Sequence, residues 1–452
     1  MALYLWTCIY LNCSIFSGTA ADSFEWSKAR NRLSVDIEDW HLGQLLQKIT
    51  DSTDWQVFVE PKTQFSRPLS ARFNELPVGE GFRRLFGEIN FALLPQRKEP
   101  PTLYVFRTSV DDATQRVMPR KRDDDRIRNE LLVRLKDGSK GEIDEIARLL
   151  GAKVTGRIDR LGIYRLLFGD DNAAQLARDS LANNGDIDLV ESNYSIPRPA
   201  QAESVPFASV PPLNIRPGSV PDSSRVIIAL IDTPVQGNVP YSEFLLPGIN
   251  LAGEANLGTV VPTHGTSMFE IIMQGLAQSQ QKNSESPVRI LPIDVYGNSG
   301  STSTFDVANG IVTAVDHGAA IVNLSLGSTA NSTMLQNVIQ QGDKNGVVFV
   351  AAAGNQPTSQ PTFPAAVPEV IAVTAGTRTG EIASWANFGS FVDVIAPGGS
   401  VVHYSGGSFY ISGTSSSAAF ISGVAGDIIA NTRATAPEVK SAISAVFGIG
   451  KK

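Results

Sequence analysis

Cysteine is nearly absent from this chain, which holds only Cys8 and Cys13 among its 452 residues. If the first stretch of the chain is removed, the remainder has no cysteine and therefore no disulfide. Charged residues make up 18%, the formal net charge is −7 and no basic stripe is present, which argues against a nucleic-acid partner. After the N-terminus no stretch approaches the ~20 apolar residues that span a bilayer.

The first 21 residues are apolar, with no acid or base before Asp22. The stretch ends in the small residues Gly18, Ala20 and Ala21, which suit a signal peptidase. A buried N-terminal strand is the alternative, but length and flanking residues fit an export signal better. The sequence predicts a signal peptide over 1–21 and an exported product, either secreted or held in the periplasm or cell envelope of a bacterium.

Two segments unlike their surroundings divide the rest of the chain. Residues 109–128 mix charge blocks without apolar periodicity, which predicts a linker. Residues 200–224 are rich in proline, which disfavours regular helix and central strand and predicts an exposed extended linker. The domains expected between and after these linkers cover residues 22–108, 129–199 and 225–452.

The first two expected domains are small α+β units. In 22–108, the strand-like LSVDI precedes apolar residues at helical spacing, followed by further short strands and a helix near 78–87. This pattern resembles the short N-terminal module of secretins and TonB-dependent receptors, which implies a protein partner in the cell envelope. In 129–199 the order strand-helix-strand-strand-helix-strand is ferredoxin-like. Its first helix is expected to bury one face, made of Ile143, Ile146, Leu149 and Leu150.

From residue 225 onward, near-continuous apolar runs alternate with helix-compatible stretches. RVIIALID, AAIVNLSLG and GVVFVAAAGN are typical of parallel strands that are buried on both faces. The pattern predicts an α/β domain with a largely parallel sheet. Sites in such sheets form beyond the carboxyl ends of the strands. Asp232, Ser325 and Asn355 each stand where an apolar strand ends.

The chain has four histidines, and three have ordinary structural explanations. His41 is expected at the surface start of a helix, His317 at the C-terminal end of another, and His403 in solvent before a turn. His264 differs, because Thr-His-Gly-Thr opens an apolar helical stretch. A lone histidine is more often structural than catalytic, so its role depends on what else the chain supplies.

Four features occur together in one order along the chain. They are Asp232 after a buried strand, HGT at 264–266, AAAGN ending at Asn355, and GTS ending at Ser415. Their separations are 32, 91 and 60 positions. In content, order and spacing the set resembles the subtilisin-like serine protease (subtilase) family. The resemblance implies a largely parallel sheet with helices on both faces, here preceded by the two small α+β domains.

The resemblance also implies the roles of these residues. Ser415 would attack the substrate, His264 would act as base and then acid, and Asp232 would orient the imidazole. Asn355 would stabilise the oxyanion together with the Ser415 N–H, where one donor is worth ~3–4 kcal/mol. No cofactor or metal ligand is expected for this chemistry; structural calcium stays open, because no Asp-rich ligand loop is found. The substrate cleft is implied to be lined by Ser325, Leu326, Gly327, Ala352, Ala353 and Gly354.

Subtilases commonly carry a ferredoxin-like propeptide that templates folding and inhibits the enzyme. LVESNYSIPRP, which begins at Leu189, resembles the end of such a propeptide, which lies in the substrate cleft. The resemblance therefore implies that residues 129–199 are an inhibitor of the chain's own peptidase domain. Processing is expected in the Pro-rich linker, between residues 195 and 225.

Three residues depart from the family pattern. Pro234 and Glu270 stand where glycine is usual, and Ala419 stands where proline is usual. None replaces a reacting atom. The sequence therefore predicts a secreted serine endopeptidase that acts on polypeptides and is made as a self-processing zymogen. The alternative is a catalytically inactive subtilase-fold protein that binds or docks at the envelope. A serine esterase of the α/β-hydrolase type is disfavoured, because the G-x-S-x-G elbow is absent around Ser415.

Overall fold

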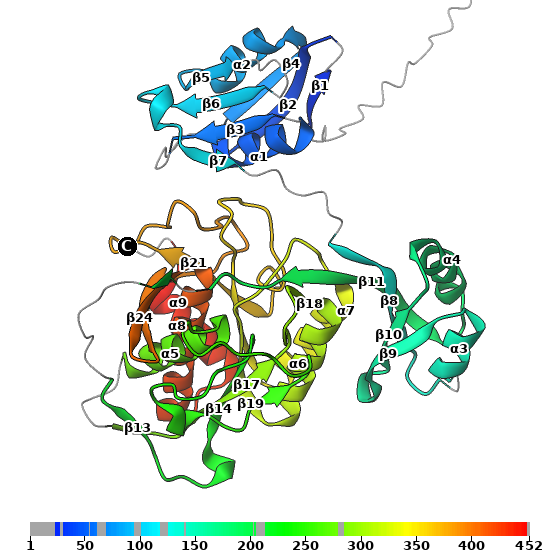
Figure 1. The fold of residues 1–452 in the computed structure, drawn as a ribbon, viewed down its shortest axis with the longest axis vertical. Helices are drawn as coiled ribbons and strands as arrows, with labels where there is room; N and C mark the ends of the chain where they lie inside the picture. The colour runs from blue at the N-terminus through cyan, green and yellow to red at the C-terminus, as the bar shows by residue number, and fades with distance from the viewer. Residues whose placement is uncertain are drawn as a thin grey trace, which may run out of the picture. The chain divides into compact units, whose positions relative to one another are not determined.

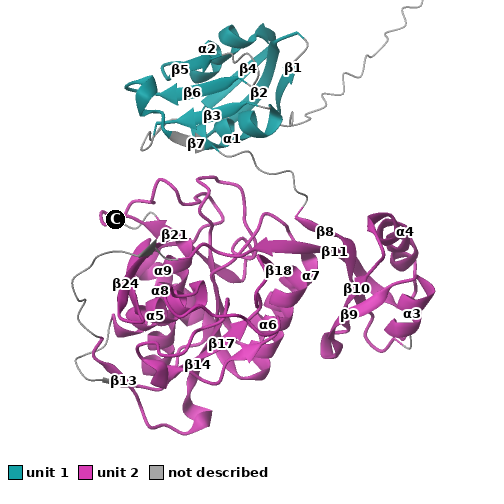
Figure 2. Ribbon diagram, viewed as in Figure 1, with its two compact units in different colours: residues 1–121 teal, residues 122–452 magenta. Residues whose placement is uncertain are grey.

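The computed structural model describes residues 23–27, 30–53, 55–60, 69–94, 101–117, 125–139, 142–201, 203–204, 213–278 and 284–449. The expected signal peptide and both cysteines lie outside these ranges. Contacts divide the chain into two compact units, residues 1–121 and 122–452 (Figure 1, Figure 2). Within the described ranges, no helix combines the length and apolarity needed to cross a bilayer.

The described residues of the first unit form two sheets and two helices. Antiparallel pairs join β1 (Ser23–Ser27), β2 (Arg32–Trp40) and β4 (Leu69–Pro77). The second sheet has the order β5-β6-β3-β7, formed by Asn90–Leu94, Thr102–Phe106, Gln56–Val59 and Gln115–Val117. The helices are α1 (Leu42–Ser52) and α2 (Val78–Phe86), and a single turn, η1, covers Val110–Asp112. The apolar residues at helical spacing in α1 are buried, as the sequence predicts.

The second unit begins with four antiparallel strands in the order β11-β8-β10-β9, and β18 adds a fifth strand to this sheet beside β11. Ile143 is buried and Ile146 and Leu150 pack partly buried against the same core, as expected, together with Ala147. Leu149 is 70% exposed and does not belong to that face. The elements follow the expected order, as β8 (Arg126–Leu135), α3 (Ile143–Leu149), β9 (Lys153–Ile158), η2 (Asp159–Leu161), β10 (Ile163–Leu167), α4 (Asp171–Ala182) and β11 (Ile187–Pro197).

A seven-stranded sheet forms the centre of the second unit, and all its strand pairs are parallel. Every residue of β17 and β20 is buried, which confirms the parallel-strand interpretation of the apolar runs. In spatial order the strands are β15 (Ile249–Asn250), β17 (Val288–Asp294), β14 (Val226–Asp232), β19 (Ala319–Leu324), β20 (Val348–Ala352), β21 (Val370–Gly376) and β22 (Val394–Pro397).

Helices cover both faces of this sheet. Ile228 and Leu230 of β14 pack in a core with α5 (His264–Ala277), α8 (Thr414–Thr432) and α9 (Ala436–Phe447). Ala229 and Ile231 point the other way and pack with α6 (Thr304–Asp316) and α7 (Thr333–Lys344). Because α5 and α8 both begin at the carboxyl edge of the sheet, the side chains of their first turns meet there.

Short strands lie at the edges of the second unit. The expected linker 200–224 is not an unpaired segment where it is described, because its short strands β12 and β13 pair with β24 and β16. Single turns η3 and η4 flank β14. The bounds are β12 (Glu203–Ser204), β13 (Ile215–Pro217), η3 (Asp222–Ser224), η4 (Ser242–Phe244), β16 (Ser284–Ser286), β18 (Ser301–Ser303), β23 (Gly399–Tyr404) and β24 (Gly407–Ser412).

Candidate active site

Asp232 and His264 form a buried pair at the carboxyl edge of the sheet. Asp232 ends β14 and is 0% exposed, and His264 begins α5 and is 3% exposed. Asp232 Oδ1 and Oδ2 lie 2.8 and 2.9 Å from His264 Nδ1. The Thr233 N–H donates to Asp232 Oδ1 at 2.6 Å and helps to fix the carboxylate. With Nδ1–H donating to a carboxylate, His264 Nε2 is left as a proton acceptor.

The start of α5 is fitted closely against the end of β14. Gly265 N donates to Thr233 Oγ1 at 2.7 Å, and a Cβ at Gly265 would lie 2.0 Å from the Thr233 carbonyl oxygen. Only glycine permits this approach. Thr263 is the N-cap of the helix, and its hydroxyl accepts from Thr266 N at 3.1 Å. The imidazole therefore projects from a helix end whose position is fixed on the sheet.

Gln236 is a positioning residue that sequence reasoning missed. Its Oε1 accepts from Thr263 N at 2.8 Å and its Nε2 donates to the Val261 carbonyl at 3.1 Å. Its backbone N–H donates to Thr266 Oγ1 at 2.9 Å. The Pro234 carbonyl accepts from Thr263 Oγ1 at 2.6 Å, so the proline joins the same network. No sequence signal marks Gln236, because its role arises only from contacts across 22 or more positions.

Ser415 lies in the first turn of α8 and is half-buried. Its Oγ donates to the Ser325 carbonyl at 3.2 Å, and Ser325 Oγ donates to the Ser415 carbonyl at 3.0 Å. Of the hydrogen bonds between described residues, none joins the His264 ring to Ser415 Oγ. Such contacts are often loose before substrate binds. The N-terminal end of α8 favours negative charge beside this hydroxyl.

Asn355 is held beside the start of α8 by Thr414. Its Oδ1 accepts from Thr414 N at 2.8 Å and from Thr414 Oγ1 at 3.0 Å. The same hydroxyl accepts from Gly354 N at 2.9 Å. A Cβ at Gly413 would lie 3.2 Å from Asn355 Nδ2. Because Oδ1 is engaged, the amide N–H groups remain available next to Ser415.

The expected cleft residues differ in what their backbone groups contact. Ser325 reaches Ser415, and Gly354 reaches Thr414, as described above. Ala353 N donates to the Val373 carbonyl at 2.9 Å, and the Ala353 carbonyl accepts from the Thr362 and Asn387 side chains at 2.6 and 2.7 Å. The backbone groups of Ala353 are therefore engaged within the domain. The side chains of Leu326 and Ala352 are buried. Gly327 packs closely against the backbone, because a Cβ there would lie 2.9 Å from the Phe363 carbonyl oxygen.

The end of β11 and the short strand β12 pair with two edge strands of the central domain. β11 extends beyond its pairing with β8 to β18 and pairs with it antiparallel (Figure 1), and Arg198 N donates to the Gly300 carbonyl at 2.8 Å. Beyond that point β12 pairs antiparallel with β24. The paired residues are Glu203 with Tyr410 and Ser204 with Phe409, and β24 ends at Ser412, three residues before Ser415. Sequence reasoning did not identify β18 or β24 as the edges that receive β11 and β12.

Two side chains of β11 cap helices of the central domain. Glu191 accepts from Ser332 Oγ, and from Thr333 N at 2.9 Å, at the start of α7. Asn193 Oδ1 accepts from Phe305 N at 3.1 Å in the first turn of α6. Burial raises the pKa of the Glu191 carboxyl, and its hydrogen bonds oppose that shift. Through these caps the N-terminal ends of both helices bind the small sheet.

Glu270 and His403 form a second pair, in which Glu270 is buried and His403 is half-buried, which corrects the expectation that His403 is solvated. His403 Nδ1 lies 2.9 Å from Glu270 Oε1, and the His403 N–H donates to Glu270 Oε2 at 2.7 Å. Glu270 is 6% exposed, and this burial raises the pKa of its carboxyl. The pair ties α5 to the hairpin β23–β24, which leads into Ser415.

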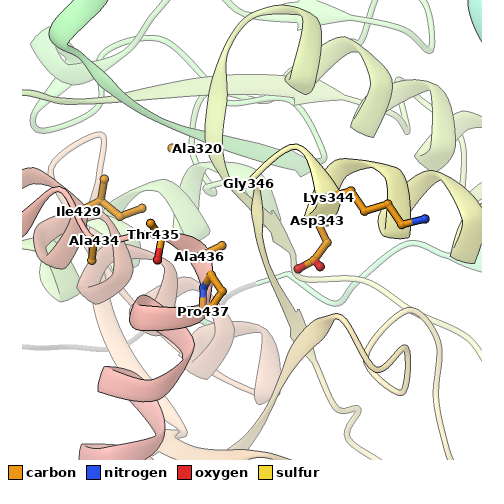
Figure 3. A pocket seen from close by; sticks show the side chains of 9 residues that line it. All are labelled: Ala320, Asp343, Lys344, Gly346, Ile429, Ala434, Thr435, Ala436 and Pro437. Atoms are coloured by element: carbon orange, nitrogen blue, oxygen red, sulfur yellow. The ribbon is translucent and has the colours of Figure 1, made fainter.

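No metal site is found in the described part of the chain, where no three His, Cys, Asp or Glu residues are grouped to hold an ion. A separate hollow of about 410 Å³ lies between the end of α7 and the α8–α9 connection (Figure 3). It contains none of the residues discussed above and no group of reactive side chains. Its lining is Ala320, Asp343, Lys344, Gly346, Ile429, Ala434, Thr435, Ala436 and Pro437.

Two protein-family profiles match the chain. The profile described as the subtilase family covers residues 223–445, and that described as the fervidolysin N-terminal prodomain covers residues 112–193. The first match includes Asp232, His264, Asn355 and Ser415. The second includes the four antiparallel strands β8 to β11 as far as Asn193.

The chain is similar to characterised proteases. It is 34% identical over 233 residues to thermitase of Thermoactinomyces vulgaris, covering 50% of this chain and 81% of that protein. It is 33% identical over 230 residues to a thermophilic serine proteinase of Bacillus sp. (strain AK1), of which it spans 56%. The solved structure of fervidolysin from Fervidobacterium pennivorans has the same fold, with a TM-score of 0.52 and 21% identity over 68% of this chain and 55% of that one.

Proposed function

We propose that this chain, which belongs to the subtilase family, hydrolyses peptide bonds through Ser415, His264 and Asp232 after it has cut itself free of its prodomain. A subtilisin-like serine endopeptidase domain follows a prodomain of the fervidolysin type. One observation carries the assignment of roles. Asp232 binds His264 Nδ1 through both carboxylate oxygens in a buried site, which leaves Nε2 as the base at the edge where Ser415 lies.

The reaction would proceed in two displacements. Ser415 Oγ attacks the substrate carbonyl carbon while its proton passes to His264 Nε2, and Asp232 stabilises the imidazolium. The oxyanion receives hydrogen bonds from Asn355 Nδ2 and the Ser415 N–H. The C–N bond then breaks, and His264 gives its proton to the leaving amine. In the second displacement water loses a proton to His264, attacks the acyl carbon and releases the carboxylic product, and the proton returns to Ser415.

The prodomain would inhibit the enzyme by filling its substrate cleft. Its last strand pairs with β18, and the strand β12 that follows pairs with β24, the strand that leads into α8. A peptide held as an added strand on both sides of a nucleophile is bound as a substrate would be. We place the self-processing cut within residues 198–201, inside the wider range that the sequence predicts.

Peptide hydrolysis tests the catalytic assignment. Purified full-length wild type and Ser415→Ala are compared on a chromogenic peptide, with Ser416→Ala as the matched control. Ser416 Oγ is buried and has no partner among the described residues, so its removal should leave activity intact. Ser415→Ala should lower kcat by roughly 10⁴-fold or more. No hydrolysis by either protein would favour the alternative of an inactive binding protein, and equal hydrolysis by both would remove Ser415 from the mechanism.

Export and an envelope partner complete the proposal. Export is supported by the apolar stretch 1–21, and the partner by the pattern of 22–108 in the first unit. Fractionation of cells that express the full chain should place the processed product outside the cytoplasm. An uncut product confined to the cytoplasm would contradict export. Cross-linking of intact cells should join the first unit to an envelope protein; linkage only through 225–452 would contradict the docking role.

A further inference from the structure

We propose that the turn Asp294–Ser299 is a subsite for an arginine side chain of the substrate, filled in the precursor by Arg198; this rests on the proposed function. Arg198 Nη1 donates to the Gly297 carbonyl at 3.1 Å and to the Ser299 carbonyl at 2.7 Å. Its guanidinium carbon lies 5.7 Å from the centre of the Tyr296 ring. Two acceptors and an aromatic face thus meet one cationic group.

The turn has internal bonds that hold these acceptors in place. Asp294 Oδ1 accepts from Tyr296 N at 2.8 Å and from Gly297 N at 2.9 Å. Ser299 N donates to the Tyr296 carbonyl at 2.8 Å. Gly297 has φ +52, and a Cβ there would lie 2.6 Å from the Ala252 carbonyl oxygen, so another residue would force the turn to move. The subsite is therefore built by the domain and does not depend on the prodomain for its shape.

The charge and chemistry of the turn suit arginine. Asp294 is 4% exposed, and its Oδ2 is buried without a hydrogen-bond partner among the described residues. Burial raises the pKa of Asp294, and the positive charge of Arg198 opposes that shift. A guanidinium keeps its charge at any working pH, is weakly hydrated and stacks on aromatic rings. A neutral side chain of the same shape would lose the attraction to the carboxylate and the ring.

The position of the subsite links it to the reaction. Asp294 is paired in register with Asp232 on the neighbouring strand. Tyr296 Oη donates to the Pro197 carbonyl at 3.2 Å, so the same residue holds the backbone of the bound segment. Counting back from the Glu203–Tyr410 pair at the same register, we infer that Ala200 corresponds to Gly413, and Arg198 is the second residue before Ala200. Substrates are therefore expected to carry arginine two residues before the cut bond.

Cut-site profiling tests this preference without assuming a sequence. The full-length wild-type chain is allowed to process itself and is then given a peptide library of mixed composition. Arginine should be enriched two residues before the cuts, whereas equal frequencies of arginine and glutamine there would overturn the subsite. Absence of any cutting would instead overturn the proposed function, so the two failures are distinct.

A matched substrate pair measures the charge effect. Peptides copying SIPRPAQA are compared with arginine or citrulline at the fourth position, since citrulline keeps the shape and loses the charge. kcat/KM should fall at least about 10-fold with citrulline. Asp294→Asn should reduce that ratio, and Asp316→Asn, which removes an exposed charge at the end of α6, should preserve it. A ratio near one in the wild type would contradict the proposal.

A readout independent of activity uses the uncut precursor. In the Ser415→Ala chain, Arg198→Gln should speed hydrogen exchange at the amide of residue 198, which is bonded to Gly300, by about 10-fold or more. Arg148→Gln, which breaks a bridge to Glu145 within α3 of the prodomain, is the comparison. If Arg198→Gln leaves exchange at 196–198 unchanged, the arginine side chain does not anchor the segment and the subsite is refuted.

Discussion

Asn355 shows how one side chain in this site is oriented by another. Thr414 donates two hydrogen bonds to Asn355 Oδ1, at 2.8 and 3.0 Å, and so fixes the orientation of the amide and of its donor, Nδ2. The donor is thus placed before substrate arrives, which is the condition under which an oxyanion hole lowers the barrier. Gln236 is a second example of a side chain that positions the site, because its hydrogen bonds to the segment 261–266 fix the loop before His264.

Replacement of Asn355 by alanine should lower kcat about 10²- to 10³-fold with little change in KM, because the lost hydrogen bond forms mainly in the transition state. Steady-state kinetics on one chromogenic peptide measures both constants. Thr414→Val is the informative companion, since it removes one of the two bonds to Oδ1 and keeps the backbone donor. Thr414→Val should lower kcat less than Asn355→Ala does. An effect of Asn355→Ala confined to KM would remove Asn355 from the oxyanion hole.

Glu270 predicts a pH dependence of stability. Its pKa is raised above the ordinary 4.5 by burial, so the folded state holds a proton that the unfolded state releases. The contribution of Glu270 to the free energy of unfolding is therefore complete below pH 4.5 and is lost as the pH rises through the raised pKa. In a Ser415→Ala background, the free energy of unfolding should fall more steeply with rising pH above 4.5 in the chain that keeps Glu270 than in the Glu270→Gln variant. Parallel curves from urea denaturation at each pH would refute this.

At the scale of elements, α5 and α8 meet through glycines. A Cβ at Gly423 would lie 2.1 Å from the Ile272 carbonyl oxygen, and one at Gly275 would lie 2.1 Å from the Phe420 carbonyl oxygen. The two backbones are therefore in direct contact. Because His264 begins one helix and Ser415 lies in the first turn of the other, this packing sets how far apart base and nucleophile lie. Ala419 is fully buried in an unbroken α8, so the absent proline does not disturb the helix.

Gly423→Ala should destabilise the domain by about 1–3 kcal/mol through overpacking and should also lower kcat by moving Ser415 relative to His264. Denaturation of the Ser415→Ala chain measures the first effect, and kinetics of the active chain measures the second. Gly237→Ala is a matched control, since nothing lies within 4 Å of a Cβ there. Equal stability of Gly423→Ala and the control would show that α5 and α8 can separate freely.

The sequence predicted elements better than it predicted the contacts between them. Local apolar periodicity located the strands before Asp232, Ser325 and Asn355, and family spacing selected His264 and Ser415. The Glu270–His403 pair spans 133 positions, and the strands β12 and β24 meet across more than 200. Such pairs leave no local pattern, and proline-rich composition even suggested an unpaired segment where β12 and β13 lie. Exposure of Leu149 is likewise a packing outcome, because its apolar neighbours already fill the core.

At the scale of the second unit, the prodomain and the peptidase domain form one body through charged and polar contacts at helix ends. Glu191 and Asn193 cap α7 and α6, and Arg165 bonds Asp306 at 3.2 Å. A Cβ at Gly156 would lie 2.4 Å from the Phe305 ring, so the surfaces also fit closely. The contacts of Asn193 and Arg165 lie at the start of α6, which directly follows β18. They therefore hold the end of β11 in its pairing with β18.

Glu191→Ala should loosen the docked prodomain, because the acceptor for the α7 N–H groups is lost at a typical cost of about 1 kcal/mol. Limited proteolysis of the Ser415→Ala chain should release the segment before residue 200 several-fold faster. Glu145→Ala, which removes a charge paired only within α3, should leave the rate unchanged. The same rate for both variants would mean that the cap at α7 does not hold the prodomain.

Self-processing tests the central claim most directly, because it requires the nucleophile, its base and the bound tail in one molecule. Intact mass and N-terminal sequence are measured on purified full-length wild type and Ser415→Ala. The wild type should yield a product that begins within residues 199–202, while Ser415→Ala should remain joined across them. Cleavage of Ser415→Ala at the same bond, or an uncut wild type, would contradict the account.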